Sequence, residues 1–277
     1  MMMSTLEHFL TEIGLPEAGR DCVLSPALPQ ERLQTLCSLL EQDEEACLQA
    51  LKTETEPNGT ALCLFSLYAF SQREAWLARG ISEQIYLDTM RDLTLWYQAC
   101  MRKTGRPGVM EWDWLLNSLK GRLVRLGRLQ YEPGDLEEAI RTDEYSFPKG
   151  VRKLEIHIPA DGKLEPEQIS SSLSQARIFF AGNKYRLMHC HSWLLSPALH
   201  RILPPSSNIL NFQSFFRVYG EDFSYRQAEE RVFGEISDRA ESYPEHTSLQ
   251  KSLKAFLLTG GRVGMGMGVI PFSEEKH

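Results

Sequence analysis

A stretch in the centre of the sequence restricts the folds that the second half of this chain can adopt. Residues 153–158 alternate polar and apolar side chains, which is the period-two pattern of a strand with one buried face. Turn residues follow at 159–163, and Pro166 then stands where the first residue of a helix is expected. Apolar residues recur every three or four positions over 166–181, and residues 185–193 return to an extended pattern. The stretch is therefore predicted to form a strand–turn–helix–strand unit.

The junction between the first strand and the helix is the part of this unit that favours ligand binding. A helix N-terminus presents backbone N–H groups without intrahelical partners, together with a partial positive charge. Both features suit a phosphate group. We therefore expect a phosphate-bearing ligand at this junction.

The remaining sequence divides into two parts near residue 120. Residues 1–120 carry helical patterns throughout, whereas 121–277 mix strand and helix patterns. Strands are predicted at 123–131, at 209–219 and at 262–270, where glycines alternate with apolar residues. These glycines are expected to let a neighbouring backbone, helix or ligand approach closely. The predicted fold class is α+β, with an all-helical first part followed by a mixed α/β sheet domain.

Composition and charge exclude several classes of protein. The chain has 277 residues, of which 42% are hydrophobic and 24% charged, values that are typical of globular proteins. A net charge of -7 argues against nucleic acid or an anionic membrane as the main partner. The sequence has no apolar run long enough to span a membrane and no signal-peptide pattern at its start. The six cysteines lack Cys-x-x-Cys spacing, and so we expect buried thiols in a cytoplasmic protein.

Three histidines form the most specific group of candidate functional side chains. His157 lies on the polar face of its predicted strand with Glu155. His189 and His191 are two residues apart and point to one side, with Trp193 continuing their row. If the two strands are neighbours, three imidazoles and a carboxylate converge. The group then fits a metal site, a general base or a set of hydrogen-bonded structural residues, and the sequence leaves these alternatives open.

Several segments also carry a resemblance to a known family. They are Arg125–Glu132, Leu154–Pro159, His191–Pro197 and Leu203–Ile209. These segments resemble the C-terminal domain of a bacterial family of acyltransferases, which joins a helical N-terminal acyltransferase domain to a GNAT-like C-terminal domain. The resemblance covers essentially the whole chain. It implies a helical N-terminal domain at 1–120 and a GNAT-like acyltransferase domain at 121–277.

The resemblance implies transfer of an acyl group from acyl-coenzyme A to an amine. GNAT enzymes splay two parallel strands apart, bind the pantetheine arm in the gap and place the pyrophosphate where the first strand turns into its helix. The matching coenzyme A residues in this chain are Ile158, Asp161, Gly162 and Lys163. The usual Gln/Arg-x-x-Gly-x-Gly/Ala pattern is absent, and only Gly162 relaxes this turn.

The same resemblance suggests catalytic roles. His157 or Glu155 would accept the amine proton, and Ser192 would donate a proton to the departing thiolate. Backbone N–H groups near the end of the first strand would polarise the thioester carbonyl. The expected acceptor-binding residues are His191, Trp193, Asn208 and Gln213.

Two other functions remain open at this stage. The missing glycine pattern favours a non-catalytic GNAT-like module that binds a ligand or regulates a partner. A metal-dependent enzyme would use His157, His189 and His191. The partners expected for the acyltransferase are a small-molecule acyl donor and an amine acceptor, with no metal cofactor, nucleic acid or membrane. The sequence does not specify the acceptor, the acyl chain length or the oligomeric state.

Overall fold

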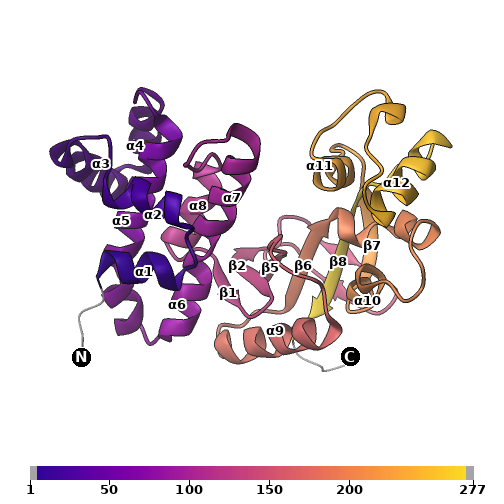
Figure 1. Cartoon of the computed structure of the whole chain (residues 1–277). Helices are drawn as coiled ribbons and strands as arrows, with labels where there is room; N and C mark the ends of the chain where they lie inside the picture. The colour runs from indigo at the N-terminus through magenta and orange to yellow at the C-terminus, as the bar shows by residue number, and fades with distance from the viewer. Residues whose placement is uncertain (1–4, 273–277) are drawn as a thin grey trace. The chain divides into compact units, whose positions relative to one another are not determined.

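The computed structural model describes residues 5–272, which form two compact units (Figure 1). The first unit extends to Leu126 and includes Pro159–Asp161, whereas the second comprises Gly127–Ile158 and the residues from Gly162 onward. None of the helices within 5–272 is long and apolar enough to cross a membrane.

The first unit is built around one buried helix, α5 (Pro57–Ala78). Apolar residues occur on nearly every side of this helix, which is typical of a helix surrounded by others. It packs against all of the other helices in the unit. Helical structure throughout the described part of 1–120 confirms the prediction for this half. The other elements are α1 (Leu6–Glu12), α2 (Glu17–Leu24), α3 (Gln30–Gln42), α4 (Glu44–Lys52), α6 (Glu83–Met90), α7 (Asp92–Thr104), α8 (Trp112–Leu119) and the strand β1 (Val124–Leu126).

Capping residues decide where these helices begin and end. The apolar pattern over 33–51 predicts one helix, but the structure contains two, because Asp43 adopts an extended conformation between them. The Asp43 carboxylate accepts the backbone N–H of Ala46 at 2.9 Å and so caps α4. Gly80 follows α5 with a φ of +79°, a conformation that glycine adopts without strain at the end of a helix.

The second unit contains a mixed sheet in which β2, β5, β6, β8 and β7 lie side by side in that order. Strands β5 and β6 are parallel, and the other adjacent pairs in this series are antiparallel. The predicted strand–turn–helix–strand unit is confirmed as β5, α9 and β6. The elements of this unit are β2 (Leu129–Asp135), β3 (Ile140–Arg141), β4 (Ser146–Phe147), β5 (Arg152–His157), α9 (Pro166–Phe179), β6 (Leu187–Ser192), η1 (Trp193–Leu195), η2 (Pro197–Arg201), α10 (Asn208–Gln213), β7 (Arg217–Asp222), α11 (Gln227–Phe233), η3 (Ala240–Ser242), α12 (Ser248–Leu258) and β8 (Met265–Pro271).

The two faces of this sheet differ in polarity. Tyr131 on β2 faces α9, because its hydroxyl lies 3.0 Å from the Ser172 hydroxyl of that helix. Ile156 is the partner of Tyr131 on β5, and so it faces α9 as well. The alternate residues, among them Glu155 and His157, therefore lie on the opposite face. The period-two pattern of β5 thus produces one apolar face against α9 and one polar face.

The predicted strand at 209–219 is wrong in its first half. The Ser207 hydroxyl accepts the N–H of Ile209 at 3.2 Å and caps the short helix α10, so that the strand β7 starts only at Arg217. The predicted strand at 123–131 is likewise interrupted at Gly127, which has a φ of +68° and separates β1 from β2. In both places a local cap or turn overrides the apolar alternation.

The glycines of β8 make the close approach that their alternation predicts. A Cβ atom at Gly266 would lie 2.2 Å from the carbonyl oxygen of Leu195, and one at Gly268 would lie 2.9 Å from a Leu195 methyl group. The short helix η1 can therefore rest directly on the sheet only because these positions have no side chain.

Replacing Gly266 by alanine should consequently destabilise the protein, because the new methyl group overlaps a backbone carbonyl that a rotamer change cannot move. We expect a loss of about 3 kcal/mol in the free energy of unfolding, measured by urea denaturation. Gly134→Ala is the matched control, since its Cβ would meet only the end of Lys153 at 3.8 Å. Equal effects of the two substitutions would contradict the packing argument.

Candidate active site

The candidate site lies where the parallel strands β5 and β6 separate. They pair only over Lys153–Glu155 and Leu187–His189. Beyond these pairs β5 continues to His157 alongside β2, while β6 continues to Ser192 alongside β8. No ladder joins the two later segments within the described chain. Their facing edges therefore present backbone polar groups that lack strand partners.

A hydrogen-bonded network crosses the sheet just before this separation. The Glu155 carboxylate lies 2.7 Å from His189 Nδ1 and accepts a hydrogen bond from Lys153 Nζ at 2.6 Å. His189 Nε2 lies 2.9 Å from the Tyr219 hydroxyl. Burial alone would raise the pKa of Glu155, but hydrogen bonds and positive charge from His189 and Lys153 outweigh it, and the pKa is lowered. Burial, with the negative charge of Glu155, raises the pKa of Tyr219 to about 12.

His157 takes part in a separate pair at the end of β5. Its Nε2 lies 2.8 Å from the Glu132 carboxylate on β2. The side chain of His157 is 25% exposed, and that of Glu132 is 36% exposed, so the pair is accessible to a small molecule. The hydrogen bond to His157 is the main reason that the pKa of Glu132 is lowered. An imidazole oriented by a carboxylate at a strand end can act as a general base.

The three histidines do not converge as the sequence suggested. His157 pairs with Glu132 and His189 with Glu155, while His191 is exposed and lies 3.7 Å from Asp222. Within residues 5–272, no group of three or more histidine, cysteine, aspartate or glutamate side chains is placed to hold a metal ion. The expected convergence is therefore wrong, because each imidazole is adjacent to a different carboxylate.

The predicted position of Trp193, in the same row as His189 and His191, is also wrong. Trp193 does not continue the row of β6 side chains, because the chain leaves the strand at Ser192 and enters η1. The Ser192 hydroxyl accepts the N–H of Leu194 at 3.2 Å and caps this turn. The Trp193 backbone N–H donates to the Gln227 side chain at 2.9 Å.

The loop between β5 and α9 is held by an arginine that the sequence analysis missed. Arg128 donates from Nε to the carbonyl of Lys163 at 2.9 Å and from Nη2 to the carbonyl of Gly162 at 2.6 Å. Gly162 and Lys163 are exposed, whereas Ile158, before the loop, is half-buried. No side chain caps the N-terminus of α9. The loop therefore has a fixed backbone and an accessible lysine.

A second arginine that sequence reasoning missed lies in the first unit. Arg125 Nη1 donates to the Asp161 carboxylate at 2.6 Å, and both side chains are mostly buried. This ion pair compensates the negative charge that Asp161 brings to the loop. Both arginines belong to the segment Arg125–Glu132, one on each side of Gly127, but their partners lie 36 and 34 residues away, so no local pattern in the sequence identifies these contacts.

The expected acceptor-binding residues have different environments. Gln213 is buried and donates its amide hydrogens to the carbonyls of Leu194 and Ser196 at 2.9 and 3.0 Å, so it holds η1 in place. Asn208 is the first residue of α10 and is half-buried. Ser192 lies on the opposite face of the sheet from His157, because it alternates with His189 and His191 along β6.

Sequence comparison assigns both halves of the chain to known domain types. The GNAT-like C-terminal domain matches residues 123–270, and the N-acyltransferase N-terminal domain matches residues 4–121. The chain therefore belongs to the acyltransferase family in which an N-acyltransferase N-terminal domain precedes a GNAT-like C-terminal domain. No curated protein matches the sequence.

Solved acyltransferase structures share the fold of this family member. One is an acyltransferase in complex with decanoyl-CoA and teicoplanin, with a TM-score of 0.75 and 24% identity over 95% of this chain and 86% of the other. Another is a mutant acyltransferase in complex with octanoyl-CoA, with a TM-score of 0.74 and 24% identity over the same shares. A third complex contains CoA and 10C-teicoplanin, again with a TM-score of 0.74 and 24% identity.

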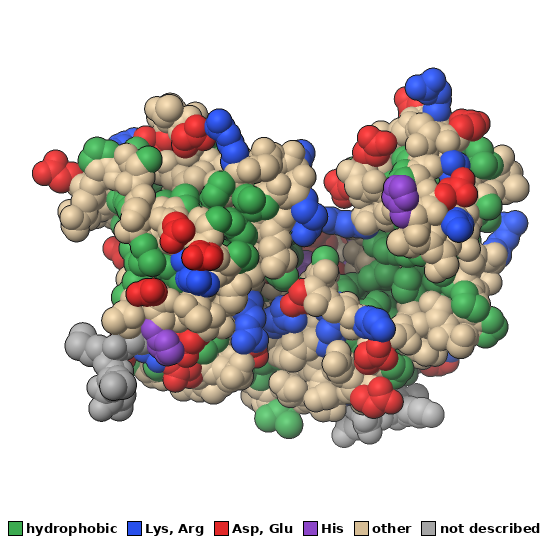
Figure 2. Space-filling model, in the orientation of Figure 1, with side chains coloured by type: hydrophobic (Ala, Val, Ile, Leu, Met, Phe, Trp, Pro, Cys, Tyr) green, Lys and Arg blue, Asp and Glu red, His purple; other side chains and the backbone are tan. Residues whose placement is uncertain are grey.

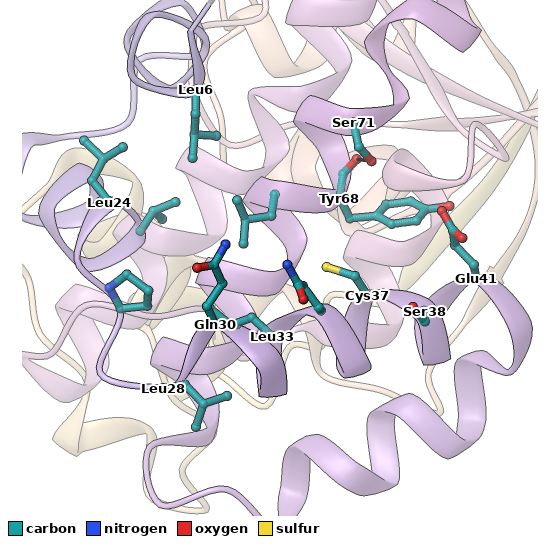
Figure 3. Close-up of a pocket in the computed structure, with 14 residues that line it drawn as sticks. Leu6, Leu24, Leu28, Gln30, Leu33, Cys37, Ser38, Glu41, Tyr68 and Ser71 are labelled. Carbon is teal, nitrogen blue, oxygen red and sulfur yellow. Dashed lines mark hydrogen bonds between the residues drawn. The ribbon is translucent and has the colours of Figure 1, made fainter.

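The helical unit of this protein contains a large cavity, and all of the residues that line it belong to that unit. It measures about 820 Å³ and is lined by residues of α1, α2, α3 and α5 and of the loop between α2 and α3. In Figure 3, leucine side chains border one part of it, and Tyr68 and Glu41 point toward one another in another part. Figure 2 shows hydrophobic side chains gathered on the visible face of this unit. None of the sequence-predicted site residues lines the cavity.

Replacing Glu155 by glutamine should destabilise the protein, because it leaves the half-buried Lys153 and the buried His189 without their carboxylate. We expect a loss of about 3 kcal/mol in the free energy of unfolding at pH 7. The folded pKa of Glu155 is lowered, so its stabilisation is present above the unfolded carboxyl value of about 4.3 and is lost as the pH falls through the folded pKa. The difference between wild type and variant should therefore shrink in acid, as urea unfolding at several pH values would show.

Glu137→Gln provides the control, because Glu137 is an exposed glutamate of the same unit. It should change the free energy of unfolding by less than about 0.5 kcal/mol at any of these pH values. A Glu155→Gln penalty that does not vary with pH would show that the lowered pKa is not its cause.

Proposed function

We propose that this protein transfers an acyl group from acyl-coenzyme A to an amine acceptor. The proposal depends chiefly on one observation, the separation of β5 and β6 after Glu155 and His189. Two parallel strands that part in this way leave unpaired backbone N–H and C=O groups facing a gap. The pantetheine arm of coenzyme A carries two amides, which can pair with these groups.

The phosphates of the donor are proposed to bind the loop after β5. Lys163 is exposed there, and the carbonyls of Gly162 and Lys163 turn toward Arg128. The uncapped N-terminus of α9 adds backbone N–H groups and a partial positive charge. Lys163, Arg128 and the helix end supply positive charge to a loop that has only one glycine of the usual pattern.

The proposed reaction is a direct transfer. The amine nitrogen attacks the thioester carbonyl, the new C–N bond forms, and the C–S bond breaks to release the coenzyme A thiolate. His157, oriented by Glu132, accepts the proton that the amine loses. Glu155 supports the site through Lys153 and His189 on the same face. The Ser192 hydroxyl caps η1 on the opposite face of the sheet from His157, so we assign the proton that the departing thiolate takes up to solvent rather than to Ser192.

The structural relatives support the choice of probes. One binds decanoyl-CoA with teicoplanin, and another binds octanoyl-CoA. We therefore propose an acyl-CoA with a medium-length chain as the donor for this protein as well. The acceptor class proposed here is an amine, and it extends to amines carried on larger molecules.

Decanoyl-CoA should raise the melting temperature of the protein. A ligand that binds only the folded state stabilises it by about 2.7 kcal/mol at a hundredfold excess over Kd. Lys163→Glu should weaken binding about tenfold, which corresponds to about 1.4 kcal/mol, because it places a negative charge where a phosphate is expected. Thermal shift measurements over a series of decanoyl-CoA concentrations test both expectations.

Lys149→Glu is the matched control, because Lys149 is also exposed but lies in the connection between β4 and β5. It should leave the decanoyl-CoA shift unchanged. No shift of the wild-type protein at millimolar decanoyl-CoA would rule out the proposed donor site.

Substituting His157 by glutamine should reduce turnover about 100- to 10,000-fold, because a glutamine cannot accept the amine proton. Turnover is measured as the release of free CoA thiol from decanoyl-CoA in the presence of a panel of small amines. The decanoyl-CoA thermal shift should be preserved, which separates catalysis from donor binding.

His246→Gln serves as the control for this measurement, since His246 is exposed in the connection before α12 and should not affect turnover. Unchanged turnover in the His157 variant would exclude this side chain as the general base.

A further inference from the structure

One buried side-chain nitrogen beside the proposed base has no hydrogen-bond partner within residues 5–272. Gln130 on β2 is only 2% exposed, yet its Nε2 atom has no hydrogen-bond partner among the described residues. Buried amide nitrogens are nearly always hydrogen-bonded in native proteins. Next to a candidate site, such an atom is a donor that a bound ligand can use.

The register of the sheet places Gln130 next to His157. These two residues are direct partners across β2 and β5, so their side chains lie on the same face. The neighbouring Tyr131 faces α9 and is satisfied there by Ser172. Glu132 follows on the polar face and is engaged with His157. Gln130 is thus the member of this row that retains an unused donor.

We infer that Gln130 is a specificity-determining residue that donates a hydrogen bond from Nε2 to an oxygen atom of the acceptor. The inference rests on the proposed acyl transfer. It combines a premise of the proposed reaction, that the acceptor amine approaches His157 on this face, with a chemical property, that an amide N–H can only donate. The atom that Gln130 recognises must therefore accept a hydrogen bond, whereas the reacting nitrogen faces the imidazole.

This geometry restricts the class of acceptor. The substrate is an amine that carries a hydroxyl or carbonyl oxygen close to the reacting nitrogen. A plain alkyl amine of the same size would leave Nε2 buried and unpaired in the complex. Sites built to hydrogen-bond a substrate oxygen discriminate against analogues that lack it. We expect a preference of roughly tenfold or more in kcat/KM.

The test compares two small probes of similar size, ethanolamine and n-propylamine, with decanoyl-CoA as the donor. Release of CoA thiol gives kcat/KM for each probe with the full-length wild type and with Gln130→Met, which keeps a similar side-chain volume without the amide. The wild type should favour ethanolamine by roughly tenfold. The variant should lose this preference through a lower rate with ethanolamine, and its decanoyl-CoA thermal shift should be unchanged.

Gln49→Met is the matched control, because Gln49 is exposed on α4 and its loss should leave the preference intact. A preference that survives in Gln130→Met overturns the inference, and so does an equal loss of rate with both amines, which indicates a purely structural role. If neither probe is acylated while decanoyl-CoA still raises the melting temperature, the inference about Gln130 fails and the donor site stands. If decanoyl-CoA does not raise the melting temperature of the wild type, the proposed function itself fails.

Discussion

The contact between Glu155 and His189 is the interaction on which the candidate site depends. These residues form the last pair of the parallel β5–β6 ladder, and their side chains meet at 2.7 Å on the polar face. Because the carboxylate is mostly removed from solvent, the imidazole and Lys153 are needed to stabilise its charge. The two strands are therefore held together up to this pair and separate immediately after it. The gap that we assign to the acyl donor begins at this contact.

The division of the sheet into two faces follows from the same pattern of alternation. One face packs on α9 through apolar residues and the Tyr131–Ser172 contact, which supports the sheet without involving the chemistry. The other face carries polar groups, and most of them satisfy one another, as in the Glu132–His157 pair. Gln130 departs from this rule. An unused donor beside the proposed base is consistent with a site that completes its hydrogen bonds with the acceptor.

In the proposed donor site, positive charge around the loop after β5 takes the place of the usual sequence pattern. The usual phosphate-binding glycines are reduced here to Gly162, and Asp161 adds a negative charge. Arg125 pairs with Asp161, while Arg128 fixes the carbonyls of Gly162 and Lys163. A loop whose backbone is held by an arginine needs less conformational freedom from glycine, and this is why the absent pattern does not exclude a phosphate ligand.

The sequence by itself determined the features that depend on local periodicity and on neighbouring residues. These are the helical first half, the β5–α9–β6 unit, and the strand β8, whose glycines admit η1. It failed at 209–219, where the Ser207 cap outweighs apolar alternation, and at the histidines, whose shared face was predicted but whose partners were not. Only the tertiary structure decided that Glu132 pairs with His157, that Arg128 holds the loop, and that Gln130 is buried beside the base. Each of these contacts joins segments about 25 or more residues apart, and their register is set by strand pairing rather than by local sequence.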